Sequence, residues 1–461
     1  MRRTRTIHLL RMKLLAAVLA LGIAGQATAA TYYVNGGNTA AKDDNDGAEK
    51  TPWKTVQKAA GVAKAGDTVI VKAGSYAERV TVTASGEKDK LITFQGEPRR
   101  QAKVLGFLIQ GDYLRIRGFE ITNDAKGNEA VAVHCGNAYD KTARKGCQIL
   151  DNFIHDIDGK GIISGTDALA KDNLLKNVGW GIVAYSNTLV ENNEIDTLMI
   201  KWGEKDGKRQ VVSNNKYAFF AGDNITFRGN YFHHPRLEDM IGPGVCFFRS
   251  WDAGGMGPSH HILIENNRGF NATHASEPGG EVLKQSSHIT FRNNLFVNTI
   301  YVGVLPKEWT NITIVHNTFI NCGAYPVWFQ TERQCEGAVV RNNLIAYYKH
   351  KPPEGAPAGE SGIANYSHPK VTIDCDYNLI FGCKNRGYGQ HDITAEPQFV
   401  DPDKGDFRLK PGSPGIDMGV DVGLKTDLEG TPRPQGKAPD IGAFELKAAD
   451  PKPAPADGDR K

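Results

Sequence analysis

The fold is decided by a stretch beyond the middle of the chain, Ser286-Ser287-His288-Ile289-Thr290-Phe291-Arg292-Asn293-Asn294-Leu295-Phe296-Val297-Asn298. A short run of alternating apolar and polar residues leads to Asn294, and a second short apolar run follows it. The same pattern surrounds Asn230 and Asn317. The equivalent asparagine recurs at positions 152, 173, 193, 230, 267, 294, 317, 343 and 378. Successive copies are separated by 21, 20, 37, 37, 27, 23, 26 and 35 residues.

A minimum spacing of 20 to 23 residues with occasional insertions is typical of a solenoid. The apolar residues alternate with period two, and Val, Ile, Phe and Thr favour strands. We therefore predict an all-β fold, a single-stranded right-handed parallel β-helix with three short strands per turn. The recurrent asparagine is expected in a left-handed turn conformation, with its amide bonded to the asparagine of the next coil. The alternative is nine unrelated turn asparagines.

The chain divides into five predicted segments. Residues 1–30 have a basic start, a short apolar core and a small-residue cleavage site, which is typical of a signal peptide. A retained membrane anchor is the alternative, although the apolar core is too short to span a bilayer. The other segments are an N-terminal cap over 31–66, the β-helix over 67–400, a closing segment over 401–447 that covers the far end, and a disordered tail over 448–461. The cap is expected to hold a helix with Thr51 as N-cap and Pro52 at its first position.

Export changes the charge of the chain. Removing residues 1–30 takes away five basic residues and no acidic one, so the formal net charge falls from +3 to −2. A globally basic, nucleic-acid-binding protein is therefore not indicated. We expect a secreted or periplasmic monomer with no nucleic-acid partner and no membrane span after signal cleavage.

Seven cysteines follow the predicted signal peptide, and disulfides persist in exported proteins. Their spacing suggests three close pairs and one remaining thiol: Cys135 with Cys147, Cys322 with Cys335, Cys375 with Cys383, and Cys246 alone. Spacing alone leaves the connectivity open. The sequence has no CxxC or clustered Cys/His pattern, so a structural zinc site is not supported.

Two lysines occupy equivalent places in the repeat. Lys284 lies ten residues before Asn294, and Lys307 lies ten residues before Asn317. If the two coils have the same turn length, the amines stack on one sheet about 4.8 Å apart. Such a pair is costly unless an anion binds between the amines or one of them loses its proton. The alternative is a pair of solvated surface lysines.

Other residues of the same region suit an anionic sugar. Arg249 lies one coil earlier, and Trp309 and Trp328 follow Lys307. An indole can stack on the apolar face of a sugar ring, although a tryptophan is more often part of the core. The sequence thus marks Arg249, Trp309 and Trp328 as candidates for binding an anionic polysaccharide.

Lys284 with the following Ser286-Ser287-His288-Ile289-Thr290-Phe291-Arg292-Asn293-Asn294-Leu295-Phe296 resembles the motif of polysaccharide lyase family six, the alginate lyases and chondroitinase B. The resemblance implies a secreted right-handed parallel β-helix, a catalytic role for Lys284, and calcium held by acidic residues before it. Glu277 and Glu281 are near those acidic positions, with a different spacing, and Lys307 stands where the family has Arg. The strand Gly280-Glu281-Val282-Leu283-Lys284 also resembles, more weakly, one of the family nine pectate lyases, whose Asp-Asp-Gly calcium cluster is missing here.

These residues suit β-elimination in a uronate-containing glycan. The reaction needs a neutralised carboxylate, a base for the proton beside it, and a proton for the leaving oxygen. Lys284 would be the base, Lys307 with Arg249 would stabilise the developing charge, and Glu277 and Glu281 could hold calcium. The main alternative is a non-catalytic glycan-binding or structural β-helix. A glycoside hydrolase ranks last, because it needs a distinct pair of inward-facing carboxylates.

Overall fold

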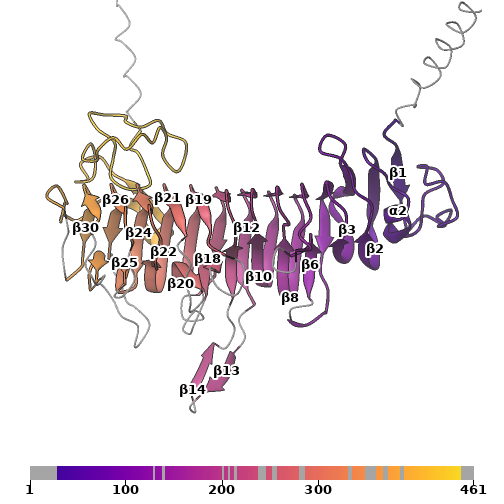
Figure 1. The fold of residues 1–461 in the computed structure, drawn as a ribbon, viewed down its shortest axis with the longest axis horizontal. Helices are drawn as coiled ribbons and strands as arrows, with labels where there is room; N and C mark the ends of the chain where they lie inside the picture. Colours follow the sequence, from indigo (N-terminus) through magenta and orange to yellow (C-terminus); the bar gives the residue numbers. More distant parts are fainter. Residues whose placement is uncertain are drawn as a thin grey trace, which may run out of the picture.

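The computed structural model describes residues 28–127, 130–137, 141–199, 202–205, 208–211, 215–236, 245–251, 257–279, 286–330, 335–347, 360–366, 372–384 and 389–447. Twenty-eight of its strands join one sheet, and the pairings in this sheet are parallel. The sheet winds into an elongated solenoid, with β1 and α2 at one end and β30 near the other (Figure 1). The predicted all-β parallel β-helix is confirmed.

Each turn contributes up to three strands, which form three stacks along the solenoid. The chain enters through β1 (Thr31–Val34), β2 (Thr68–Val82) and β3 (Ile92–Ile109). Because β3 pairs with β4, β5 and β6, it runs through all three stacks. The first stack then contains β4 (Leu114–Arg117), β7 (Gln148–Leu150), β9 (Leu169–Lys171), β11 (Leu189–Glu191), β16 (Thr226–Arg228), β19 (His260–Glu265), β21 (Ser287–Arg292), β23 (Thr313–Val315), β26 (Val339–Arg341) and β29 (Asp374–Asp376).

The second and third stacks share several long strands that bend between them. The second stack contains β5 (Phe119–Ile121), β8 (Phe153–Ile163), β10 (Leu174–Ala184), β12 (Glu194–Leu198), β17 (Tyr231–His233), β20 (Arg268–Gly279), β22 (Leu295–Val304), β24 (Thr318–Cys322), β27 (Leu344–Ala346) and β30 (Leu379–Phe381). The third stack contains β6 (Val131–His134), the later parts of β8, β10, β20 and β22, and β15 (Lys216–Phe220), β18 (Cys246–Trp251), β25 (Tyr325–Phe329) and β28 (Ile363–Asn365).

Two antiparallel pairs lie outside this sheet. One is β13 (Trp202–Lys205) with β14 (Lys208–Val211), a hairpin that projects away from the solenoid (Figure 1). The other is β31 (Phe399–Asp401) with β32 (Asp406–Leu409), joined by the 3-10 turn η3 (Pro402–Lys404). The solenoid sheet begins with β1 (Thr31–Val34) and ends with β30 (Leu379–Phe381), whereas the sequence predicted a β-helix over residues 67–400.

The asparagine ladder is present at all nine predicted positions, between the first and second stacks. Asn294 donates from its backbone N–H and from Nδ2 to Oδ1 of Asn317, over 3.0 and 2.9 Å. The same pair of bonds links every other neighbouring pair of ladder residues. All nine side chains are buried, and at the last of them Asn378 N–H donates to Asp392 Oδ1. Stacked amides thus satisfy buried donors that water cannot reach.

The left-handed turn residue is the one before the ladder asparagine. Asn293, His316 and Asn342 have φ of 51°, 52° and 57°, whereas no ladder asparagine has a positive φ. The expectation that the ladder residue itself is left-handed is therefore wrong. With the sharp bend at the preceding residue, the ladder amide points inside the coil, where Asn294 Nδ2 also donates to the carbonyl of Ile264 at 2.8 Å.

Replacing Asn294 with Ala should destabilise the fold by about 3 kcal/mol or more. The substitution removes the acceptor for two donors of Asn267 and the donor to Ile264 O. Each buried polar group left unpaired costs about 1–3 kcal/mol. The change would be measured by denaturant unfolding, with Asn38→Ala as control, because the Asn38 side chain accepts a bond in an exposed turn. Equal unfolding midpoints for the two variants would contradict a stabilising role of the ladder.

A short helix closes the N-terminal end. The helix α2 (Val56–Ala60) begins after Thr55, whose side chain accepts the backbone N–H of Lys58, and ends at Gly61. Three of its five residues are buried in the solenoid core, and it packs against β1 and β2. The predicted capping helix is present at the expected end.

The helix starts four residues later than predicted, so Thr51 is not the N-cap and Pro52 is not helical. The Thr51 hydroxyl donates to Asp46, and the backbone of Trp53 exchanges hydrogen bonds with the first strand through Tyr33 and Asn35. This pairing extends the backbone around Trp53. The first position free to turn into a helix is therefore the residue after Thr55.

The closing segment lies on the flank of the solenoid. It was expected to cover the far end, but residues 401–447 pack along the outer side of the second stack (Figure 1). The contact buries apolar side chains from both sides: Leu295, Val297, Ile320, Leu344 and Leu379 from the stack, and Phe407, Leu409, Leu428, Ile441 and Phe444 from the segment. A fully buried ion pair, Arg433 Nη1 to Glu445 Oε2 at 2.8 Å, holds the segment together. The outer face of the second stack is apolar because this segment covers it.

All seven cysteines lie within the described residues, and all are free thiols, so the pairs suggested by spacing are not formed. The thiols of Cys135 and Cys147 are hydrogen-bonded, and this contact raises the pKa of Cys135. Among the residues described, no helix has the length and apolar character needed to cross a membrane. The predicted signal peptide and tail lie almost entirely outside the described residues.

Candidate active site on the third stack

A group of polar side chains lies on neighbouring strands of the third stack. Lys216, Cys246 and His274 are paired in register on β15, β18 and β20. Three residues further along the chain, Arg249 and Glu277 are paired on β18 and β20. We call these five residues together with Lys307 the polar cluster.

Alternation along β15 places Lys216 on the outer side. Tyr217, the residue after Lys216, has its ring in the core against Phe232 and Phe247. Because successive strand residues point to opposite faces, Lys216 points outward. Its side chain is nevertheless buried, while those of Arg249, Glu277 and Lys307 are 13%, 18% and 22% exposed. The cluster thus has a buried amine and three partly accessible charges.

Glu277 joins the other members of the cluster. Its Oε2 accepts from Arg249 Nη1 at 3.0 Å and from the Cys246 thiol at 3.6 Å. Its Oε1 lies 3.7 Å from Lys307 Nζ. Arg249 Nε is buried and has no partner among the described residues. The Glu277 carboxylate therefore orients Arg249 and Lys307, and the Arg249 Nε–H is available to donate to another group.

The electrostatics of the cluster shift two pKa values strongly. Burial, aided by the charge of Arg249, lowers the pKa of the Lys216 amine to about 8. Burial, together with the charges of Lys216, Arg249 and Lys307, lowers the pKa of His274 to about 4, although Glu277 opposes the shift. His274 is therefore neutral at pH 7, and a sizeable fraction of Lys216 is neutral near pH 8. The pKa of Glu277 is lowered by the cations around it, against its burial.

The described donors do not suit calcium. Calcium takes six to eight oxygen ligands. Around Glu277 the available donors are the Cys246 sulfur and the His274 nitrogen, whose atoms lie within 4.8 Å of one another and of the carboxylate. Arg249 and Lys307 already contact the Glu277 carboxylate, and their positive charges oppose the binding of a further cation. The expected role of Glu277 as a calcium ligand is therefore not compatible with this arrangement.

The structure brings together part of the predicted site. Arg249, Glu277 and Lys307 meet as described above. Lys307 lies in the loop after β22, and its predicted stacking partner Lys284 is outside the described residues, as is Glu281. Trp309 is fully buried in the solenoid core, so it cannot stack on a sugar, and its assignment as a binding residue is wrong.

Three members of the cluster were missed from the sequence. Lys216, Cys246 and His274 each begin the third-stack part of a coil, yet they precede their ladder asparagines, Asn230, Asn267 and Asn294, by 14, 21 and 20 residues. Unequal loop lengths hide the equivalence. The available signal was a polar residue before an apolar run, as in Lys216-Tyr217-Ala218-Phe219-Phe220, and it is weak on its own.

Aromatic side chains extend the same outer face in both directions. Trp328 on β25 is partly exposed, and its ring centroid is 5.0 Å from that of Tyr325. Tyr366, 45% exposed, meets Tyr325 edge-on at 5.8 Å. We call Tyr325, Trp328 and Tyr366 the aromatic cluster. On the N-terminal side, Trp180 on β10 is partly exposed and contacts Phe219 at 5.4 Å.

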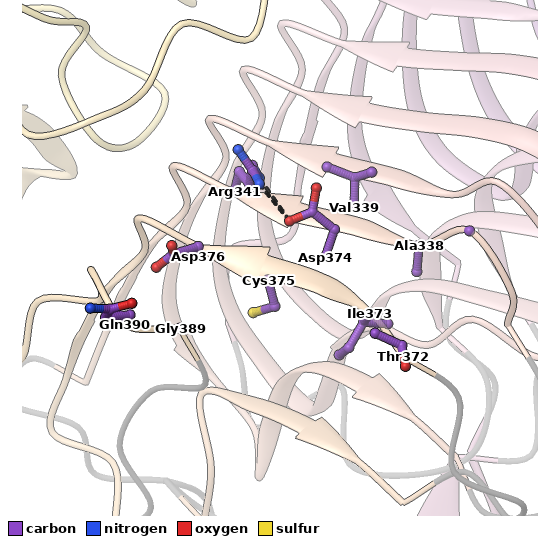
Figure 2. A pocket seen from close by; sticks show the side chains of 11 residues that line it. Ala338, Val339, Arg341, Thr372, Ile373, Asp374, Cys375, Asp376, Gly389 and Gln390 are labelled. Carbon is purple, nitrogen blue, oxygen red and sulfur yellow. Dashed lines mark hydrogen bonds and ion pairs between the residues drawn. The ribbon is translucent and has the colours of Figure 1, made fainter.

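Two hollows lie elsewhere on the solenoid. One of about 630 Å³ is on the first stack beside β26 and β29, where Arg341 and Asp374 form an ion pair (Figure 2). In Figure 2 the Asp374 carboxylate turns toward Arg341, whereas the Cys375 sulfur points away from this pair. The other, of about 690 Å³, lies between the second stack and η3. Neither hollow includes a residue of the polar cluster, and in the first hollow the charges of Arg341 and Asp374 neutralise each other. We therefore place the candidate site on the third stack.

Comparison with known proteins supports the fold. A family model described as right handed beta helix region matches residues 164–345. No curated protein matches the chain. The complex structure of XylC with xylose is 13% identical, with a TM-score of 0.52 over 90% of this chain and 98% of that one. Pectate lyase Pel9A is 16% identical, with a TM-score of 0.47 over 91% and 97% of the two chains.

The PL6 family alginate lyase AlyGC is 14% identical, with a TM-score of 0.41 over 77% of this chain. The matched region spans 54% of the length of AlyGC. The family model over residues 164–345, together with the likeness to the XylC structure, supports a right-handed parallel β-helix, the predicted fold. Any activity has to be argued from the residues of the third stack.

Proposed function

We propose that this protein is an exported polysaccharide lyase that cleaves an anionic, uronate-containing glycan by β-elimination. The observation that carries the proposal is the convergence of Lys216, Arg249 and Lys307 around Glu277 on the outer face of the third stack. Cationic groups gathered in this way suit an anionic ligand. The predicted signal peptide supports export.

Arg249 and Lys307 would hold the uronate carboxylate. Neutralising this carboxylate acidifies the neighbouring C5–H, which is the bond that breaks first. Glu277 keeps the two cations in place, and the unpartnered Arg249 Nε offers a further hydrogen bond. A carboxylate in this position replaces part of the solvation that burial has removed from the cations.

Lys216 would be the base, which requires that glycan binding gives the sugar access to its buried amine. A neutral amine takes the C5 proton, the electron pair forms the C4–C5 double bond, and the C4–O bond breaks, with solvent supplying the proton to the leaving oxygen. Lysine acts as a base when its surroundings lower its pKa, and that of Lys216 is about 8. Lys284 is the second candidate, from the resemblance to family six lyases. No step is assigned to calcium, because the described donors do not suit it.

The purified protein should convert alginate, pectate or chondroitin into products that absorb in the unsaturated-uronate band. With the polymer that reacts, kcat/KM should rise about tenfold per pH unit up to about pH 8 and then level off, because the base must be neutral and the pKa of Lys216 is about 8. A lysine with the ordinary pKa of about 10.4 would give a rate that rises beyond pH 9. Such a profile would exclude Lys216 as the base.

A non-catalytic glycan-binding protein is the second candidate. The exposed aromatic cluster favours it, because rings that present a free face suit sugars whether or not a bond is cleaved. In that case the protein is retarded in a gel that contains the polymer, but it forms no product that absorbs in the unsaturated-uronate band at any pH between 6 and 10. Absorbance that requires Lys216 or Lys284 would exclude this alternative.

A further inference from the structure

The polar and aromatic side chains of the third stack fall into two rows along the solenoid axis. Lys216, Cys246 and His274 are paired in register, and His274 is level with Tyr325 because both pair with Val302. Ile182 pairs with Ala218. Trp180 and Lys216 each lie two residues before this pair, so they occupy equivalent positions on neighbouring strands. The first row therefore begins and ends with an aromatic ring.

The second row contains Arg249, Glu277 and Trp328. Ser276 pairs with Val304, and Val304 pairs with Val327, so the residues after Ser276 and Val327 occupy the same level. These residues are Glu277 and Trp328. The charged part of the outer face is thus followed, in the same row, by the largest aromatic side chain of this region.

We propose that the polysaccharide lies along the solenoid axis over the third stack, with sugars bound at Trp180 and at the aromatic cluster on either side of the polar cluster. A chain held on both sides of the reacting unit is cleaved at internal linkages. The inference rests on the proposed lyase activity for the cleavage, but the binding surface stands independently of it.

The aromatic cluster has the chemistry of a sugar site. Tyr325 and Trp328 lie on β25, and Tyr366 follows β28 of the next coil. The rings of Tyr325 and Tyr366 meet edge-on, which leaves ring faces for a ligand. Trp328 Nε1 is buried without a partner among the described residues. A buried donor of this kind marks a place where another molecule completes the hydrogen bonding.

The N-terminal side of the cluster suits a charged sugar. Lys160 Nζ lies over the Trp180 ring, 5.5 Å from its centroid. An indole beside an amine offers a stacking surface and a partner for a carboxylate at the same place. Trp180 is one strand away from Lys216, so a sugar bound here would neighbour the reacting unit.

The separation of the two sides sets the size of the ligand. From β10 to β25 there are five strand steps through β15, β18, β20 and β22. At about 4.8 Å per step, the two sides are about 24 Å apart. A ligand that touches both is an oligosaccharide of several units, so short fragments should lose the contribution of one side.

Binding is tested with the full chain carrying both Lys216→Met and Lys284→Met, so that neither candidate base can degrade the ligand. Retardation in gels containing alginate, pectate or chondroitin gives the affinity. Trp180→Ala and Trp328→Ala should each weaken binding to one of these polymers about tenfold, as loss of an aromatic hot spot does. Tyr231→Ala is the matched control, because Tyr231 is 39% exposed on the second stack. Trp328→Phe should retain most of the affinity, and thermal midpoints check that each variant is folded.

Unchanged binding in both tryptophan variants, or an equal loss in Tyr231→Ala, would overturn the binding surface. For the wild type, the viscosity of the polymer should fall early, while little unsaturated product has formed. Absorbance that accumulates at nearly constant viscosity would overturn internal cleavage. If no polymer is cleaved and the tryptophan variants still bind less, the binding surface is supported and the elimination is not.

Discussion

Replacing Lys216 with Met should lower the rate of elimination about 10²- to 10⁴-fold, the usual effect of removing a general base. The same change should stabilise the fold at pH 7. Burial lowers the pKa of Lys216 from 10.5 to about 8, and each pKa unit corresponds to about 1.36 kcal/mol. A methionine of similar length has no charge to bury, so the gain in unfolding free energy should be up to about 3 kcal/mol.

The sign of the stability effect can be checked with pH. The folded-state pKa of Lys216 is below its unfolded-state value, so between about pH 8 and pH 10 the unfolded chain binds more protons. Wild-type stability therefore rises with pH over this window, and the advantage of Lys216→Met should shrink. Urea unfolding of both proteins at pH 7 and pH 10 measures this difference.

Lys284→Met decides between the two candidate bases. If Lys216 is the base, this variant keeps an activity plateau above about pH 8. If Lys284→Met is inactive while Lys216→Met retains the wild-type rate, the base is Lys284, as the resemblance to family six lyases implies. If Lys216→Met is more stable than the wild type but inactive, the wild-type lysine is needed for activity although it lowers the stability of the fold.

Arg249→Met should lower kcat about 10²- to 10³-fold, the effect of losing one group that stabilises developing charge. It should also cost about 1–3 kcal/mol of stability, because Glu277 Oε2 loses a charged donor in a mostly buried place. Arg249→Lys should restore part of the activity, since it returns the charge without the planar fork. Steady-state kinetics on the cleaved polymer and urea unfolding measure the two effects.

Arg228→Met is the matched control for Arg249→Met. Arg228 forms a similar ion pair with Glu265, with 2.5 Å between Nε and Oε1, but on the first stack. Its loss should affect stability without changing the rate. If both arginine variants lower activity in proportion to the folded fraction, Arg249 has a structural role only.

The solenoid and its internal ladder could be predicted from the amino-acid pattern alone. Asn294 and its equivalents must recur because each amide bonds the amide of the next coil, and that requirement appears directly in the spacing. The sequence also identified Arg249, Glu277 and Lys307, which the structure brings together around one carboxylate. Local patterning was sufficient for the ladder because neighbouring coils repeat the same side chain at the same corner, whereas Glu277 was marked by the resemblance to family six lyases.

The neighbours of these residues became evident only in the folded chain. Lys216, Cys246 and His274 are equivalent in register but not in their distance to the ladder, because the loops between the third and first stacks differ in length. The position of Trp309 in the core could not be read from its neighbours either, since a single aromatic residue in a loop can turn inward or outward. Side chains on a stack meet across hydrogen-bonded strands, so strand pairing determines which side chains are neighbours, and their separation along the chain does not.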